Sequence, residues 1–139
     1  MELIGRLHPL LIHFPIALVI AAVAAEAGAM ITHDARWRQV GITNLRAGAL
    51  FAVLAALAGW SFAPAGDVDP STLLQWHRWA GTIAAILSVT AAVTAGGAGR
   101  SATPARLVYR LALFAAGVLI GITGHLGGLL VWGVVLLRP

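Results

Sequence analysis

The stretch LHPLLIHFPIALVIAAVAAEAGAM, residues 7–30, decides the fold class of this chain. It contains one carboxylate, Glu26, and neither lysine nor arginine. A helix of about 20 apolar residues crosses the hydrocarbon core of a bilayer, so this stretch is long enough to span it. Three similar stretches follow at about residues 40–63, 70–95 and 104–137. We therefore predict an all-α integral membrane protein, with residues 1–139 forming a single domain of four transmembrane helices.

The composition supports a membrane protein and excludes several other classes. Hydrophobic residues make up 60% of the chain and charged residues only 10%, against roughly a quarter charged in soluble domains. The net charge of +4 comes from arginines near the helix ends, which membrane topology explains better than nucleic-acid binding. The lack of cysteine excludes iron–sulfur clusters, thiolate metal sites and covalently attached haem, and the lack of lysine excludes a retinal Schiff base. No motif of a stand-alone enzyme is present.

The links between the predicted helices differ in charge, and this predicts the orientation. Because positive residues stay on the cytoplasmic side, the arginine-bearing first and third links are expected inside and both termini outside. Short links favour an up-down-up-down bundle. We therefore expect a multi-pass protein of the bacterial inner membrane with both termini in the periplasm. The residues behind this prediction are Arg36, Arg38 and Arg46 at the first link, Asp67 and Asp69 in the second, and Arg100, Arg106 and Arg110 at the third.

Prolines indicate where the predicted helices begin or break. Asp69-Pro70 and Thr103-Pro104 each place a capping side chain before a proline that the first helical turn tolerates. Pro15 has no N–H to donate to the carbonyl of Leu11, so a regular helix cannot run through the HPLLIHFP opening at residues 8–15. We expect a bent element before the first long helix.

Four histidines are expected in the outer half of the bundle. At a rise of about 1.5 Å per residue, His13 and His77 lie roughly 10 Å inside the outer surface and His125 somewhat deeper, with His8 at the rim. Ionisable groups inside a bilayer are costly, and those that converge from several helices usually form a site, although each alone could bond a backbone carbonyl. An ideal helix separates His8 from His13 by about 140°, so they either serve different partners or are brought together by the proline bend.

Three motifs carry a resemblance to a known family. They are HPLLIHFP at residues 8–15, WHRWAG at 76–81 and TGHLGG at 123–128. Together they resemble a family of small four-helix bacterial membrane proteins of uncharacterised function that share an HPxxxHFP opening. Members are sometimes joined to c-type cytochrome modules, so the resemblance implies a cytochrome-b-like protein in a redox setting. It also implies a polar core formed by His8, His13, His77 and His125.

A non-covalently bound haem b suits these residues. It takes one or two imidazole ligands, for which His13, His77 and His125 are the candidates, and it needs cations near its propionates, for which Arg78 and Arg6 lie at the right level. The function predicted from this is electron transfer near the periplasmic face. The donor would be a c-type cytochrome or another soluble carrier, and the acceptor a membrane partner inside a larger complex or oligomer.

Glycines near two of the histidines would give a flat macrocycle bare backbone to lie against. Gly81 follows His77 by one turn. Small residues are also the usual packing surface between membrane helices, so packing alone explains them equally well. The strip that borders His125 consists of Gly117, Gly121, Gly124 and Gly128.

Two other functions remain open at this point. The same imidazoles suit a transition metal such as zinc or copper, although no carboxylate or thioether stands near them. The chain could also be a non-catalytic accessory subunit whose histidines bind a quinone, a lipid or a partner helix.

Glu26 is the only carboxylate inside a predicted span. It is expected at the level of Arg46 and Asn44 on the second helix, so we predict a salt bridge between neighbouring helices. A proton-conducting role is the alternative.

Overall fold

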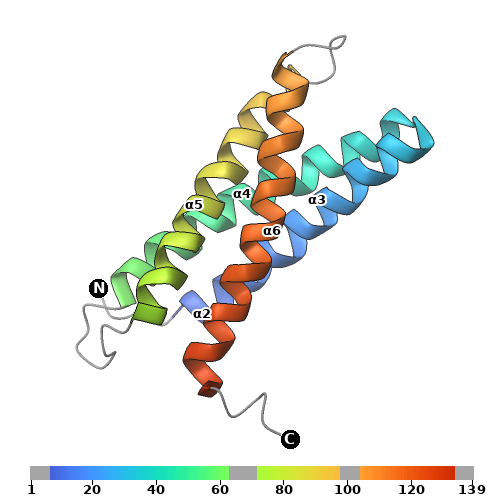
Figure 1. Cartoon of the computed structure of the whole chain (residues 1–139). Helices are drawn as coiled ribbons and strands as arrows, with labels where there is room; N and C mark the ends of the chain where they lie inside the picture. The colour runs from blue at the N-terminus through green and yellow to red at the C-terminus, as the bar shows by residue number, and fades with distance from the viewer. Residues whose placement is uncertain (1–6, 63–71, 98–103, 134–139) are drawn as a thin grey trace, which may run out of the picture.

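The computed structural model describes residues 7–62, 72–97 and 104–133, and within these ranges the chain is helical and contains no strand. A single turn of helix, α2 (His8–Leu11), precedes four long helices. These are α3 (His13–Thr32), α4 (Ala35–Phe62), α5 (Thr72–Thr94) and α6 (Pro104–Trp132), as labelled in Figure 1. The predicted all-α class is confirmed.

Within the part of the chain that the structure describes, three segments are long and apolar enough to cross a membrane. They are His8–Thr32, Ala35–Ser61 and Pro104–Trp132. Helix α5 is long, but its first turns carry Gln75, His77 and Arg78, which lower its hydropathy. The structure therefore supports a membrane protein with three candidate spans and a fourth long helix packed against them.

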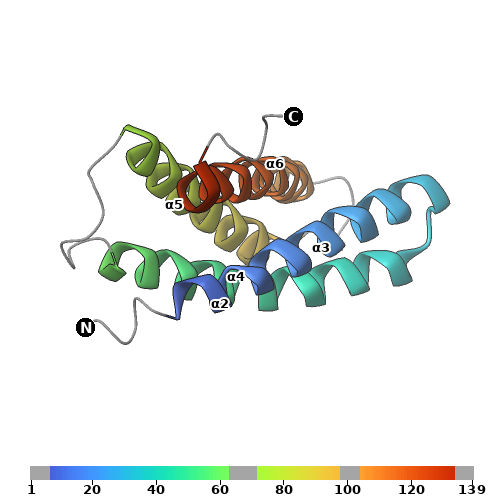
Figure 2. The ribbon, with the colours of Figure 1, turned by 90° about the horizontal axis from the view of Figure 1, so that it is seen from below.

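The long helices form two antiparallel hairpins. Helices α3 and α4 pair in one hairpin and α5 and α6 in the other, and the hairpins cross so that α4 packs on α5 and α3 on α6 (Figures 1 and 2). His33, at a left-handed φ of 57°, ends α3, and Asp34 Oδ1 accepts from the Arg36 N–H at 2.8 Å to begin α4. Helix α4 thus starts at Ala35, earlier than the expected residue 40, because the apolar pattern locates the span and not the polar turn before it.

The predicted interruption of the first helix is limited to the hydrogen bonding around Ile12, whose backbone stays helical at φ −63° and ψ −26°, so the expected bent element does not form. The Ile12 N–H still bonds the carbonyl of His8 at 3.1 Å and the Ile16 N–H bonds that of Ile12 at 3.3 Å. Between them Pro15 has no N–H for the carbonyl of Leu11. Pro15 itself is buried inside α3. Asp69-Pro70 and Thr103 lie outside the described residues, and α6 begins at Pro104 as expected.

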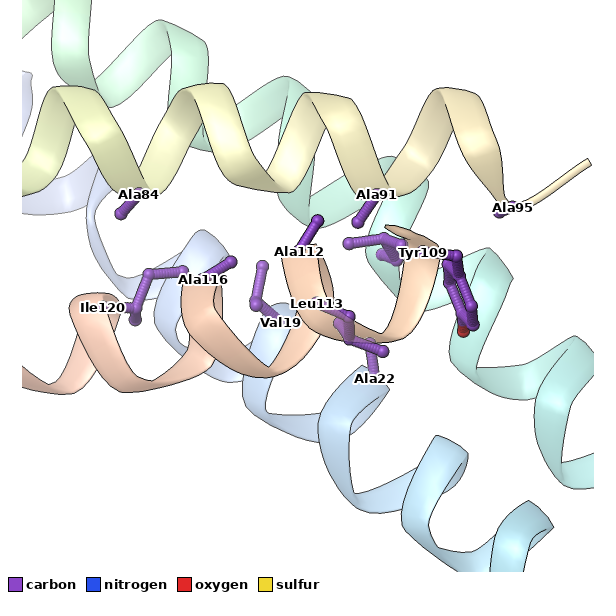
Figure 3. Close-up of a cluster of buried hydrophobic side chains, with 11 residues drawn as sticks. Val19, Ala22, Ala84, Ala91, Ala95, Tyr109, Ala112, Leu113, Ala116 and Ile120 are labelled. Carbon is purple, nitrogen blue, oxygen red and sulfur yellow. The ribbon is translucent and has the colours of Figure 1, made fainter. Parts of the chain in front are cut away.

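The core between the hairpins consists mostly of alanine, as Figure 3 shows. Small side chains let membrane helices approach closely. At Gly48 an added Cβ would lie 2.8 Å from Val19 Cγ2, and at Gly117 it would lie 2.8 Å from Val23 Cγ2. Beyond Ile120, no described residue of α6 is fully buried. The close packing therefore ends before the last third of that helix.

Glu26 ties three helices together near the turn of the first hairpin. It is fully buried and accepts hydrogen bonds from Arg110 Nε at 2.8 Å, from Tyr109 Oη at 3.1 Å and from Arg38 Nε at 3.3 Å. The predicted salt bridge exists, but Arg46 as its partner is wrong. The early start of α4 places Arg38 beside Glu26.

Asn44, the other residue expected beside Glu26, instead donates to the carbonyl of Val40 in its own helix at 2.9 Å.

Candidate functional site

Two histidines from different hairpins meet at the end of the bundle where α2 and α5 begin and α4 and α6 end. The ring centres of His8 and His77 are 6.2 Å apart, and the ring planes are nearly perpendicular at 88°. His8 belongs to α2 and His77 to the second turn of α5. Helix α2 packs against α4 at this end of the bundle.

Both rings are held by a backbone carbonyl of the helix that follows in their own hairpin. His8 Nδ1 lies 2.9 Å from the Ala55 carbonyl on α4, and His77 Nδ1 lies 3.0 Å from the Thr123 carbonyl on α6. A carbonyl oxygen can only accept, so Nδ1 carries the proton in each ring. In the neutral form of either ring, the lone pair is then on Nε2. This is the state in which metal-ligating histidines are found.

A glycine faces each of these rings. An added Cβ at Gly59 would lie 2.9 Å from His8 Cε1, and one at Gly127 would lie 3.1 Å from His77 Cε1. Each glycine is four residues after the carbonyl that the ring bonds, and positions four apart share a helix face. We call each combination of carbonyl and glycine a histidine seat: Ala55 with Gly59 for His8, and Thr123 with Gly127 for His77.

The two seats border a cavity of about 520 Å³, which lies within the range of roughly 300–1,000 Å³ typical of cofactor pockets. All four long helices and α2 line it, mostly with apolar and small residues. The lining includes Pro9, Ile12, Ile16, Ala52, Ala56, Gly81, Ala85, Ile120, Gly124, Gly128 and Trp132.

Arg78 is the one charged residue among the described residues that line the cavity. Its guanidinium carbon lies 4.7 Å from the centre of the Trp60 ring, a cation–π contact. Its Nε is buried and has no hydrogen-bond partner among the residues that the structure describes. Trp60 is in turn oriented by a hydrogen bond from its Nε1 to Thr82 Oγ1 at 3.0 Å. The cavity thus offers an oriented cation with an unused donor.

The structure brings together only some of the histidines that the sequence singled out. His8 and His77 both line the cavity. His13 and His125 are exposed and do not line the cavity. Helical periodicity places His13 about 140° around the helix from His8, and His125 lies two residues after Thr123, about 200° around the helix.

Of the two arginines expected at the site, one lines the cavity. Arg78 lines the cavity, whereas Arg6 lies outside the described residues. Across residues 7–62, 72–97 and 104–133, no group of three or more His, Asp or Glu side chains lies close enough to hold a metal ion.

Sequence reasoning missed Trp60 as a cavity residue and the two glycines of the seats. Gly59 had a usable signal, because it immediately precedes a tryptophan near the end of a predicted span. Gly127 belongs to the TGHLGG motif, but the predicted strip of glycines beside His125 did not include it. The seats are made by carbonyls, which every residue carries, so no residue type identifies them.

Comparison with known proteins places the chain in a family. A family model described as predicted membrane protein (DUF2231) matches residues 6–137, nearly the whole chain. No similar curated protein and no similar solved structure was found. The matched region includes both histidine seats and the Glu26 cluster. The chain therefore belongs to this family of predicted membrane proteins.

Proposed function

We propose that this protein binds haem b between His8 and His77 and carries electrons at the periplasmic side of the bacterial inner membrane. The observation that carries the proposal is the pair of imidazoles, each fixed through Nδ1 and each with Nε2 available, on the wall of one apolar cavity.

The number of converging ligands favours haem over a bare metal ion. Zinc and copper sites usually take three or four protein ligands. In a haem the macrocycle supplies four nitrogens, and the protein adds one or two axial ligands. Among the described residues two imidazoles meet and no third ligand joins them. This donor set fits a haem iron.

The spacing and the cavity are also compatible with such a group. Two imidazole nitrogens on opposite sides of one metal centre are about 4 Å apart, and the ring centres lie further back. The 6.2 Å between the ring centres of His8 and His77 leaves room for one metal centre. The glycines of the seats keep the two rings at this separation, because a Cβ at either position would push its ring away.

Arg78 supplies the charge that a haem carboxylate requires. Its buried Nε has no partner within the described chain, and its guanidinium is held over Trp60. A propionate placed there would accept a charge-assisted hydrogen bond. Arg6 remains a proposed second cation.

A haem held by His8 and His77 would supply one-electron transfer. The chain's own residues hold the ligand, exclude water with an apolar lining and orient its acidic edge. The redox partners we propose are a c-type cytochrome or another periplasmic carrier on one side and a membrane partner, such as a quinone-reactive complex, on the other.

The proposed orientation follows from the charges at the two ends of the bundle. Arg36, Arg38 and Arg110 lie near the turns of the hairpins, and we place this end in the cytoplasm. The exposed Trp60, Trp76, Trp79 and Trp132 lie near the opposite end, as expected for an interfacial belt. All four long helices would then cross the membrane up-down-up-down with both termini outside.

An absorbance experiment tests the proposal. The protein is expressed with ample haem supply and purified in mild detergent, and the Soret band is measured for the wild type and four variants. We expect the band in the wild type and its loss or shift in His8→Gln and His77→Gln. Glutamine keeps a donor for the Ala55 or Thr123 carbonyl while removing the ligand. The matched controls His13→Gln and His125→Gln should keep the wild-type spectrum.

Two results would refute the proposal. A wild type without a Soret band, before and after reconstitution with haem, would leave the cavity to a colourless ligand such as a quinone or a lipid. A normal spectrum in both His8→Gln and His77→Gln would show that haem is held elsewhere.

A further inference from the structure

Each hairpin contains a contact between a histidine ring and a backbone carbonyl, at equivalent positions in the two hairpins. In the first, a histidine near the start of the leading helix bonds a carbonyl 47 residues later; in the second, the separation is 46 residues. In both, a glycine follows that carbonyl by four residues and lies close to ring atom Cε1. The two Cβ distances, 2.9 and 3.1 Å, are nearly equal.

The buried faces of the leading helices are also in register with their histidines. Counted from His8 and from His77, four buried positions coincide between α3 and the segment from α5 to Ala95, whereas buried Ala25 matches half-buried Thr94 and buried Ala85 matches exposed Ile16. Helical periodicity gives each helix one buried face, but it does not fix the rotation of that face relative to a histidine. The matched buried pairs are Pro15 with Ala84, Val19 with Ser88, Ala22 with Ala91, and Glu26 with Ala95.

Buried positions along the second helix of each hairpin, α4 and α6, also match. Counted back from Ala55 and from Thr123, five buried positions coincide along α4 and α6, whereas buried Ala55, Ala58 and Ala112 match half-buried Thr123, Leu126 and Asn44. The matched pairs are Gly41 with Tyr109, Leu45 with Leu113, Gly48 with Ala116, Ala49 with Gly117, and Ala52 with Ile120. Few of these pairs are identical residues, so the equivalence lies in packing rather than in sequence.

The two hairpins also begin at the same end of the bundle and run in the same order, as Figure 1 shows. Repeats arranged in parallel are related by a pseudo-two-fold axis along the membrane normal, as in some transporters. A ligand between His8 and His77 lies between one hairpin and the other. It therefore lies on or near that axis.

We infer that the two hairpins are equivalent halves that clamp a single ligand between them, so that each chain takes one haem and both histidines are required to the same degree. This inference rests on the proposed function. It excludes a second haem held by His13 or His125. The position equivalent to His125 is Leu57, and both side chains are exposed, as expected for a surface that faces lipid.

The halves differ at the positions that carry charge, and this difference orients the ligand. The position equivalent to Arg78 in the first hairpin is Pro9, and the position equivalent to Trp60 in the second is Gly128. One side of the cavity therefore has a cation held on an aromatic ring, and the equivalent side has neither group. The clamp takes a flat ligand whose acidic groups lie along one edge, with that edge toward Arg78.

The experiment measures haem stoichiometry in the full chain. Haem is quantified as its pyridine complex and protein by amino-acid analysis, for the wild type, His8→Gln and His77→Gln. We expect one haem per chain in the wild type and a loss of at least tenfold in both variants, equal within a factor of about two. Two haems per chain, or a variant that keeps its haem while the other loses it, would overturn the inference.

A second measurement on haem-free protein separates this inference from the proposed function. Gly59→Ala and Gly127→Ala insert the same methyl group against equivalent rings, so they should lower the melting temperature of the apoprotein equally, within about 2 °C for shifts of several degrees. Absence of haem in the wild type would refute the proposed function and the single-haem stoichiometry. Unequal melting shifts would refute the equivalence of the hairpins whether or not haem binds.

Discussion

Replacing Glu26 with glutamine should destabilise the protein without changing the cavity. The carboxylate is fully buried and is shared by the guanidinium groups of Arg38 and Arg110 and by the hydroxyl of Tyr109. Glutamine has almost the same shape, but it carries no charge and presents an amide N–H₂ to cations. The substitution therefore leaves two arginines without a counter-charge.

The expected magnitude follows from the burial of the partners. Removing one partner of a fully buried ion pair costs about 3–5 kcal/mol. The side chains of Arg38 and Arg110 are 20% and 27% exposed, so part of their charge can be solvated again once Glu26 is replaced. We therefore expect the lower end, about 3 kcal/mol, which is roughly a hundredfold in the folding equilibrium. Tyr109→Phe removes one hydrogen bond and keeps both ion pairs, so it should cost about 1 kcal/mol.

The assay is reversible unfolding in mixed micelles, followed by tryptophan fluorescence, with the Soret band recorded in parallel. Glu26→Gln should lose about three times as much stability as Tyr109→Phe, and neither should alter the haem spectrum, because neither residue lines the cavity. A loss below 1 kcal/mol for Glu26→Gln, or one no larger than that of Tyr109→Phe, would refute the assignment of Glu26 as the charge that neutralises both arginines. A changed haem spectrum would instead favour the proton-conducting alternative.

Three further substitutions test other parts of the structure. Arg78→Gln should weaken the binding of haem about tenfold or more, because one charge-assisted hydrogen bond is lost. Binding of the haem dimethyl ester, which has no free propionate, should not change. Equal weakening of both would contradict a contact between Arg78 and a propionate. Gly48→Ala should lower the free energy of unfolding by about 1–3 kcal/mol in the same assay, because its Cβ would lie 2.8 Å from Val19 Cγ2. The control Gly121→Ala meets nothing within 4 Å, so it should be neutral or stabilise the protein by up to about 1 kcal/mol. His33→Gly should raise stability by a few tenths of a kcal/mol because the residue adopts a φ of 57°, and a fall would show that the imidazole makes a stabilising contact.

The sequence predicted the helices better than the contacts between them. Apolar stretches and Pro15 were sufficient to predict four long helices and the missing hydrogen bond near the start, because both depend on local properties of the chain. The start of α4 was missed because Asp34 begins a polar helical turn that hydropathy cannot detect. The partner of Glu26 was wrong for the same reason, since moving the start of α4 changes which residue faces it.

For the candidate site, the sequence indicated the correct end of the bundle but not the pairing of its histidines. Depth follows from counting residues, whereas the direction of a side chain depends on the rotation of each helix about its axis. His8 and His13 illustrate this, because they lie about 140° apart around the helix, and only His8 lines the cavity while His13 is exposed. The repeat of the two hairpins was not visible either, because matched positions share burial and rarely share residue type.

The histidine seats also determine which changes in sequence the site tolerates. The anchoring atoms are main-chain carbonyls, so no particular side chain is required at positions 55 and 123 to hold the rings, and these positions already differ within this chain as alanine and threonine. At positions 59 and 127 an added Cβ would lie 2.9 and 3.1 Å from a ring carbon, so a larger residue there would shift the ring. Most substitutions near the site should therefore leave the two imidazoles in place as the protein diverges. Substitutions at positions 59 and 127 are the few that should move them.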